Sequence, residues 1–179
     1  MRYAIWYNDC HIRKGGERWH SSNTEWSWTA RTTVRDLNLL GSFRSLSDAA
    51  LDRILAISDG ISGDVQELCE TVWLATSNGD VIGDAEINAG LRLVFAREEK
   101  AFGPALARLT ASQAAVLKGL AYMPDARPFS GDFISRCGIR NVGTVTRALT
   151  RLQNDEIIFE HSGGWRFTNP FFREWLKTM

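Results

Sequence analysis

Residues 110–179 carry signals for a helix, a short helix, a tight turn, a longer helix and a hairpin, and this order constrains the fold more than any other feature. Thr110-Ala111-Ser112-Gln113 reads as a capping box, because the threonine hydroxyl can accept from the third amide while the glutamine reaches back. Ser130 and Asn141 are favourable N-caps for the next two helices. Gly138 lies between those helices and lets the chain reverse, so the second helix is expected to project from the core of the domain.

Two short apolar runs predict a β-hairpin near the end of the chain. Ile157-Ile158-Phe159 and Trp165-Arg166-Phe167 flank the tip sequence His161-Ser162-Gly163-Gly164. Asn169-Pro170 then starts a last short helix. Three helices followed by a hairpin is the element order of a winged helix-turn-helix, which we expect for residues 105–179.

The helix that follows the turn has an apolar inner face and a polar outer face. Short polar and basic side chains on such a face suit a DNA groove or its phosphates. The candidate DNA-binding residues lie on this helix, on the turn before it and on the hairpin: Arg140, Asn141, Thr144, Arg147, Arg151, His161 and Arg166. Two alternatives stay open: Arg147 and Arg151 could pair with Asp155 at their own helix end, or the face could pack on another domain.

Residues 44–104 predict three further helices. The caps are expected at Ser45 and Asp84, and the strongest stripe of apolar residues lies on the middle helix: Val65, Leu68, Cys69, Val72 and Trp73. Gly103-Pro104 is expected to break the third helix and close this unit. The preceding segment, 1–43, holds four of the seven tryptophans and shows no helical stripe. The predicted fold is mainly α: a helical unit, then a winged helix-turn-helix with a C-terminal β-hairpin.

Charge and cysteine content exclude several classes of protein. The 21 basic and 21 acidic residues give a formal net charge of zero, so no field of the whole chain draws it to nucleic acid or to a membrane. Residues 1–110 hold twelve basic and fifteen acidic side chains and residues 111–179 hold nine and six, so an anionic partner is expected at the C-terminal part. Without a long apolar run, a signal-peptide pattern or paired cysteines, we expect a cytoplasmic protein with no membrane partner.

Residues 50–179 resemble the helical lid and winged helix of archaeal-type P-loop ATPases in the STAND branch of the AAA+ group. Gly60 and Gln66 keep the spacing of the family's lid helix, although Ser62 stands where proline is usual. Three further stretches carry the resemblance: Leu68-Cys69-Glu70-Thr71-Val72-Trp73, Leu109-Thr110-Ala111-Ser112-Gln113 and Phe172-Arg173-Glu174-Trp175-Leu176. The resemblance implies a lid-like unit over 44–104, followed by the winged helix.

The nucleotide-binding core of that family has no counterpart in the sequence. No G-x-x-x-x-G-K-[ST] loop is present to cradle phosphates, and no apolar strand ends in paired acids that could hold magnesium. The arginine that senses the γ-phosphate in many relatives would fall near Gln66, which carries no charge. The resemblance therefore implies that the chain is not an enzyme but the C-terminal part of such an ATPase without its nucleotide-binding core. Such a part could be a truncated copy, a split partner or the product of a changed reading frame.

The sequence thus favours a non-catalytic module that contacts double-stranded DNA, another domain or a separate P-loop ATPase. The alternative is a free-standing winged-helix transcription regulator whose N-terminal part senses a ligand or dimerises. We expect no cofactor. We also expect no metal, because Cys10, His11 and His20 lack the paired spacing of a zinc site.

We expect the chain neither to bind nor to hydrolyse ATP, because it has no loop of backbone amides for the phosphates. Isothermal titration with Mg-ATP should give no heat of binding, and a phosphate-release assay should show no turnover. Micromolar binding with turnover would contradict this expectation.

Overall fold

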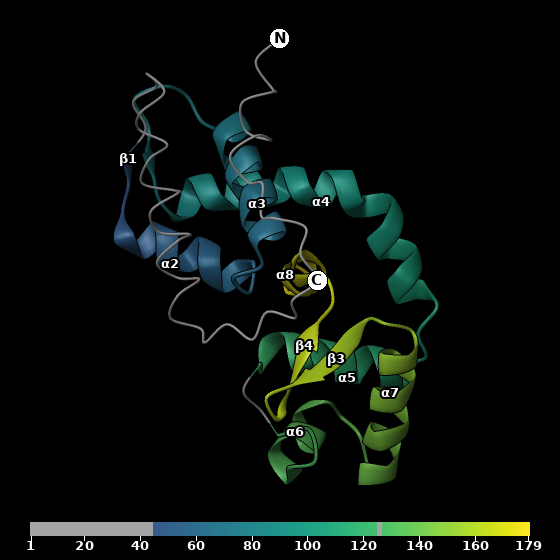
Figure 1. Ribbon diagram of the computed structural model, residues 1–179. Coiled ribbons are helices and arrows are strands. Elements are labelled where there is room, and N and C mark those ends of the chain that lie inside the picture. Colours follow the sequence, from purple (N-terminus) through teal and green to yellow (C-terminus); the bar gives the residue numbers. More distant parts are fainter. Residues whose placement is uncertain (1–44, 125–126) are drawn as a thin grey trace, which may run out of the picture.

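The computed structural model describes residues 45–124 and 127–179, so the tryptophan-rich segment 1–43 lies outside the described residues (Figure 1). The described part is mainly helical and ends in a β-hairpin and a short helix, as the sequence predicts. Its elements are β1 (Ser45–Leu46), α2 (Asp48–Ile57), α3 (Ser62–Ala75), β2 (Val81–Ile82), α4 (Asp84–Ala107), α5 (Ala111–Tyr122), α6 (Gly131–Arg136), α7 (Val142–Asn154), β3 (Ile158–His161), β4 (Gly164–Phe167) and α8 (Pro170–Leu176).

Helices α2, α3 and α4 form the first group, which we call the helical unit. Two predicted helix caps are wrong. The cap of α2 is Ser47 and not Ser45, because the Ser47 hydroxyl accepts from the Ala50 amide at 3.1 Å. The cap of α4 is Gly83, one residue before the predicted Asp84. In the predicted apolar stripe of α3, Val65, Leu68 and Val72 are buried, whereas Cys69 and Trp73 are half-buried. The short parallel pair β1–β2 joins the segment before α2 to the segment before α4.

The closest approach within the helical unit is between α3 and α4. A Cβ atom placed on Gly90 of α4 would lie 2.5 Å from Cγ2 of Val72 and 2.8 Å from its backbone nitrogen. No side chain larger than hydrogen fits at this crossing, so glycine sets the distance between the two helices.

The predicted helix break at Gly103-Pro104 is wrong, because α4 continues to Ala107 with Pro104 inside it. A proline disfavours helical geometry in the residue before it through a clash with that residue's Cβ, and Gly103 has no Cβ. The helix bends along its second half instead of ending (Figure 1), which is the usual effect of an internal proline. One continuous helix therefore runs past the predicted boundary.

The elements after α4 confirm the predicted winged helix. Thr110 and Gln113 close the capping box of α5, with the Gln113 Oε1 atom accepting from the Thr110 amide at 2.8 Å. Gly138 has a φ of 64°, in the left-handed region, and turns the chain between α6 and α7. In the hairpin, Ser162 and Gly163 have φ angles of 51° and 77°, which is the positive pair that a two-residue type I′ turn needs.

Helix α8 lies between the helical unit and the winged helix (Figure 1) and joins their cores. Phe172 and Trp175 of α8 pack on Phe102 of α4, with ring centroids 5.0 and 5.6 Å away. The buried residues of both groups belong to one continuous hydrophobic cluster. The helical unit and the winged helix thus both pack against the last turns of α4 and against α8.

One buried ion pair fixes α8 to the helical unit. Nη1 of Arg173 lies 2.6 Å from Oδ1 of Asp59 in the α2–α3 turn, and Nη2 donates to the carbonyl oxygens of Ala56 and Ile57, both at 2.9 Å. The Arg173 and Asp59 side chains are only 10% and 11% exposed. Burial acts to lower the pKa of the Arg173 guanidinium, but its hydrogen bonds and the charges of Asp59 and Glu174 outweigh burial and raise it.

Replacing Gly90 with alanine should lower the free energy of unfolding by about 1–3 kcal/mol, because the new methyl group meets the Val72 backbone. Gly63→Ala on α3 is the matched control, since a Cβ there has open space, and it should be neutral or stabilising by about 0.5 kcal/mol. Urea denaturation followed by circular dichroism measures both. Equal effects of the two substitutions would contradict the close approach.

Arg173→Met should lower the free energy of unfolding by about 3–5 kcal/mol, because it removes the nearer cation of the buried Asp59 carboxylate and leaves only the more exposed Arg166, 3.6 Å away. In the double variant Asp59→Asn/Arg173→Met the loss should be smaller than the sum of the two single losses, since no charge is left unpaired. Denaturation of the four proteins completes the cycle. Additive losses would show that the pair contributes nothing to stability.

Candidate nucleic-acid interface

Helix α7 is the exposed helix of the winged domain. The carboxamide oxygen of Asn141 accepts from the Thr144 amide at 2.9 Å and so caps the helix start. The inner face packs on α5 through its buried residues: Val145, Ala148, Leu149 and Leu152. Figure 1 shows α7 along one edge of the winged helix, below the last turns of α4. Its outer face is exposed.

The outer face of α7 consists of two neighbouring rows of exposed residues. The basic row is Gly143, Arg147 and Arg151, and the threonine row is Val142, Thr146 and Thr150. Members of each row are four residues apart, which places them on successive turns of one side of a helix. Of these six residues, only Arg147 and Arg151 were predicted to contact a partner.

The two arginines of the basic row are held along their own helix. Nε of Arg147 donates to the Gly143 carbonyl at 3.2 Å, and Nε of Arg151 lies 2.9 Å from Oδ2 of Asp155. The predicted alternative pairing with Asp155 is thus confirmed for Arg151 and not for Arg147. Because exposed pairs of this kind contribute little energy, neither contact prevents the terminal guanidinium nitrogens from meeting a phosphate.

Asn141 and Thr144 are placed differently from the arginines. The Asn141 carboxamide oxygen accepts both the amide and the hydroxyl of Thr144, at 2.9 and 3.0 Å. Their hydrogen-bonding groups thus serve the start of α7. Arg140 is exposed in the turn directly before this cap. Of the predicted residues, Arg140, Arg147 and Arg151 offer basic groups on or beside α7.

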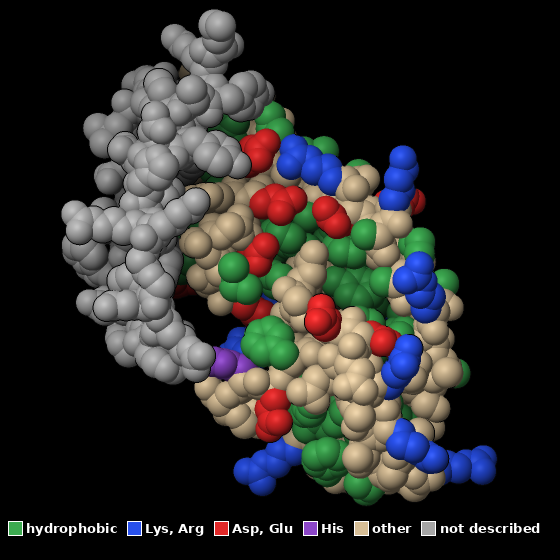
Figure 2. Space-filling model, turned by 45° about the vertical axis from the view of Figure 1, so that its right-hand side comes forward, with side chains coloured by type: hydrophobic (Ala, Val, Ile, Leu, Met, Phe, Trp, Pro, Cys, Tyr) green, Lys and Arg blue, Asp and Glu red, His purple; other side chains and the backbone are tan. Residues whose placement is uncertain are grey.

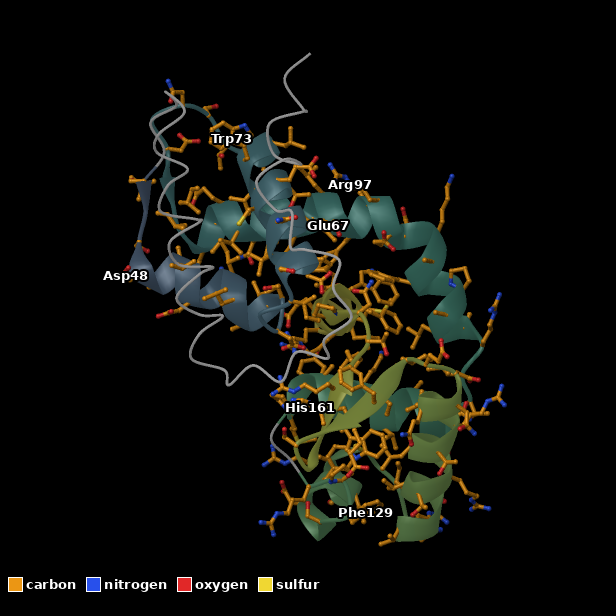
Figure 3. The ribbon with its side chains drawn as sticks, viewed as in Figure 1. Asp48, Glu67, Trp73, Arg97, Phe129 and His161 are labelled. Carbon is orange, nitrogen blue, oxygen red and sulfur yellow. The ribbon has the colours of Figure 1, made fainter. Side chains whose placement is uncertain are left out.

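The two hairpin residues lie apart from this group. The free end of the hairpin, where His161 is labelled in Figure 3, is on the opposite side of the domain from α7 in Figure 1. His161 is exposed and has its ring edge-on to Phe159, with centroids 6.4 Å apart. Arg166 turns toward the helical unit, with its Nη1 3.6 Å from Oδ1 of Asp59. The structure does not bring His161 and Arg166 together with the arginines of α7.

Charge is divided between the two groups of helices more sharply than the sequence analysis suggested. Residues 45–104 hold four basic and eleven acidic side chains, a net charge of −7, whereas residues 105–179 hold ten and six, a net charge of +4. The net charges of residues 1–110 and 111–179 differ less, because the first 44 residues carry a net positive charge that offsets the negative charge of the helical unit. Within the described residues, the winged helix is therefore the part whose charge favours a polyanion.

The acidic side chains are concentrated where α3 and α4 meet. Burial and the nearby charge of Glu98 raise the pKa of Glu67, and burial and Asp59 raise that of Asp64. Figure 3 shows Glu67 and Arg97 beside each other at this place. Arg97 lowers the pKa of Glu67 but less than the other causes raise it.

The winged helix presents separate cations rather than a continuous basic patch. Figure 2 shows the Lys and Arg side chains of one face projecting singly along its edge, with polar and apolar surface between them. Such spacing gives few simultaneous phosphate contacts, so binding to a polyanion is expected to be moderate in strength.

The described residues contain no group of three or more His, Cys, Asp or Glu side chains able to hold a metal ion. Cys10, His11 and His20 lie outside them. Burial raises the pKa of Cys69 to about 11 and also raises that of Cys137, so both thiols stay protonated at neutral pH. Among the helices that the structure describes, none has the length and apolar character that crossing a membrane requires.

Comparison with known proteins finds a match for the C-terminal part of the chain. Residues 100–178 match a family model described as a probable winged helix domain. The match begins inside α4, which agrees with the packing of Phe102 against α8. No curated protein and no solved structure matches the chain. The chain thus carries a winged helix domain, a fold that serves nucleic-acid or protein interaction.

Proposed function

We propose that this chain is a cytoplasmic, non-catalytic module that binds double-stranded DNA through the outer face of α7. The observation that carries the proposal is the exposed pair Arg147 and Arg151, four residues apart on the outer face of a helix at the edge of the winged helix. Arg140 extends the basic row beyond the helix start. A helix held in this way by a tight turn can enter a major groove.

The polarity of the α7 face supports DNA over a protein partner. Apart from Val142, which is 47% exposed, the outer positions of α7 carry polar, basic or glycine residues. Protein interfaces are usually centred on apolar or aromatic anchors, whereas contacts to phosphate come from arginine and short polar side chains. The acidic helical unit would repel DNA, so only the winged helix approaches it.

The resemblance to STAND-type ATPases supports a second candidate, docking of the helical unit on a separate P-loop ATPase. Its specific observation is a set of exposed apolar side chains on that unit: Ile61 at 43% exposed, Leu74 at 55% and Val81 at 67%. Exposed apolar surface marks contact sites in many proteins. This docking would leave α7 uncovered, so it is compatible with DNA binding. A free-standing regulator would instead be a stable dimer that binds a palindromic duplex.

Fluorescence anisotropy with a 20-base-pair duplex of mixed sequence, repeated over a series of salt concentrations, tests the DNA proposal. Arg147→Ala/Arg151→Ala should weaken binding at low salt and make the slope of log affinity against log salt shallower by about 1.8, since each phosphate contact contributes about 0.9. The matched control is Arg92→Ala/Lys100→Ala, which removes the same charge from exposed positions of α4. The control should change neither affinity nor slope.

Two results would contradict the proposal. Equal losses in the α7 variant and the α4 control would mean that only net charge matters. Absence of any binding by the unaltered chain at low salt would end the DNA proposal and leave protein docking as the better account.

A further inference from the structure

The threonine row of α7 has its hydroxyl groups engaged with the helix backbone. The Thr146 hydroxyl donates to the Val142 carbonyl at 3.1 Å, and the Thr150 hydroxyl donates to the Thr146 carbonyl at 3.0 Å. A hydroxyl has one proton to donate, so neither threonine keeps a donor for a base edge. The hydrogen bond also fixes the side-chain rotamer, since threonine is restricted at χ1. What these exposed residues offer a partner is chiefly their methyl groups.

Val142 extends the same row toward the start of the helix. Its side chain is 47% exposed although it is apolar, and it lies one turn before Thr146. Methyl groups from Val142, Thr146 and Thr150 thus follow one another along α7. The basic row runs beside them and can contact the phosphates that border a groove on that side.

Other means of reading bases are scarce on this part of the helix. The Asn141 carboxamide, which could otherwise recognise adenine, accepts two hydrogen bonds at the helix cap. The remaining carboxamides, Gln153 and Asn154, lie at the other end of the helix. Arg147 and Arg151 are held by their Nε atoms along the helix, an orientation that suits phosphates. Methyl contact is the readout that the centre of α7 can make.

We propose that α7 recognises the C5-methyl groups of thymine through Thr146, Thr150 and Val142, and so prefers duplexes rich in A·T pairs. This inference rests on the proposed DNA-binding function and adds the class of base that is read. In the major groove, thymine is the base that presents a methyl group, and apolar side-chain atoms contact it. The row of methyl groups on α7 is complementary to successive thymines in that groove.

The test replaces thymine with uracil, which differs only by lacking the C5-methyl group. Binding is measured by anisotropy for a 20-base-pair alternating A·T duplex and for its uracil counterpart, at one low salt concentration. The unaltered chain should bind the thymine duplex about four-fold more tightly for each methyl group that it contacts, a factor expected from burial of one such group. Thr146→Ser/Thr150→Ser keeps both hydroxyls and removes both methyl groups, so it should bind the two duplexes more nearly equally.

Two further variants separate this inference from the function on which it rests. Thr146→Val/Thr150→Val keeps a methyl group at each position and loses the hydroxyl, and it should keep the preference for thymine. Arg147→Ala/Arg151→Ala should weaken binding to both duplexes by the same factor and leave their ratio unchanged. Equal affinity of the unaltered chain for both duplexes, or a preference for thymine that is undiminished in the serine variant, would overturn thymine recognition while DNA binding stands. No binding to either duplex would instead overturn the function itself.

Discussion

The buried contact between Arg173 and the α2–α3 turn determines how the two groups of helices are placed. A guanidinium that is removed from water must regain its hydrogen bonds within the protein, and this one has four acceptors: a carboxylate oxygen of Asp59, a carboxylate oxygen of Glu174 and the carbonyls of Ala56 and Ile57. Those two carbonyls belong to the end of α2, where backbone acceptors lack partners within the helix. The arginine of α8 therefore supplies hydrogen-bond donors to the end of α2. Since α8 also packs on Phe102, the orientation of the winged helix follows from this contact.

The same arrangement separates an inner side of the winged helix from an outer side. Helix α8 and Arg166 of the hairpin are directed toward the helical unit, the latter through its approach to Asp59. Helix α7 is left on the outside with its polar face exposed. Arg166 of the hairpin, which was predicted to reach a phosphate, thus faces the helical unit, whereas His161 near the hairpin tip stays exposed. The predicted basic groups that remain beside one another for a partner are those of α7 and of the turn before it.

What could be predicted from the sequence depended on the distance along the chain over which the signal acts. The caps at Thr110, Ser130 and Asn141 act within three residues, and each was placed correctly. The helix break at Gly103-Pro104 failed because a glycine before the proline removes the clash on which the rule depends. The contact of Arg173 with Asp59 spans 114 residues and has no local signature. The threonine row was overlooked because its meaning comes from hydroxyl contacts, which a residue type does not reveal.

The unequal division of charge gives the described part of the chain a permanent electric dipole. Its negative pole is the helical unit, at −7 over residues 45–104, and its positive pole is the winged helix, at +4 over residues 105–179. In the field of a polyanion, a dipole experiences a torque even where a net force is weak, and it turns its positive end forward before contact. The chain would therefore rotate before it binds the polyanion, and the winged helix would face the polyanion in a larger share of encounters. A chain of zero net charge can gain in this way part of the orientational advantage that strongly basic proteins obtain from attraction.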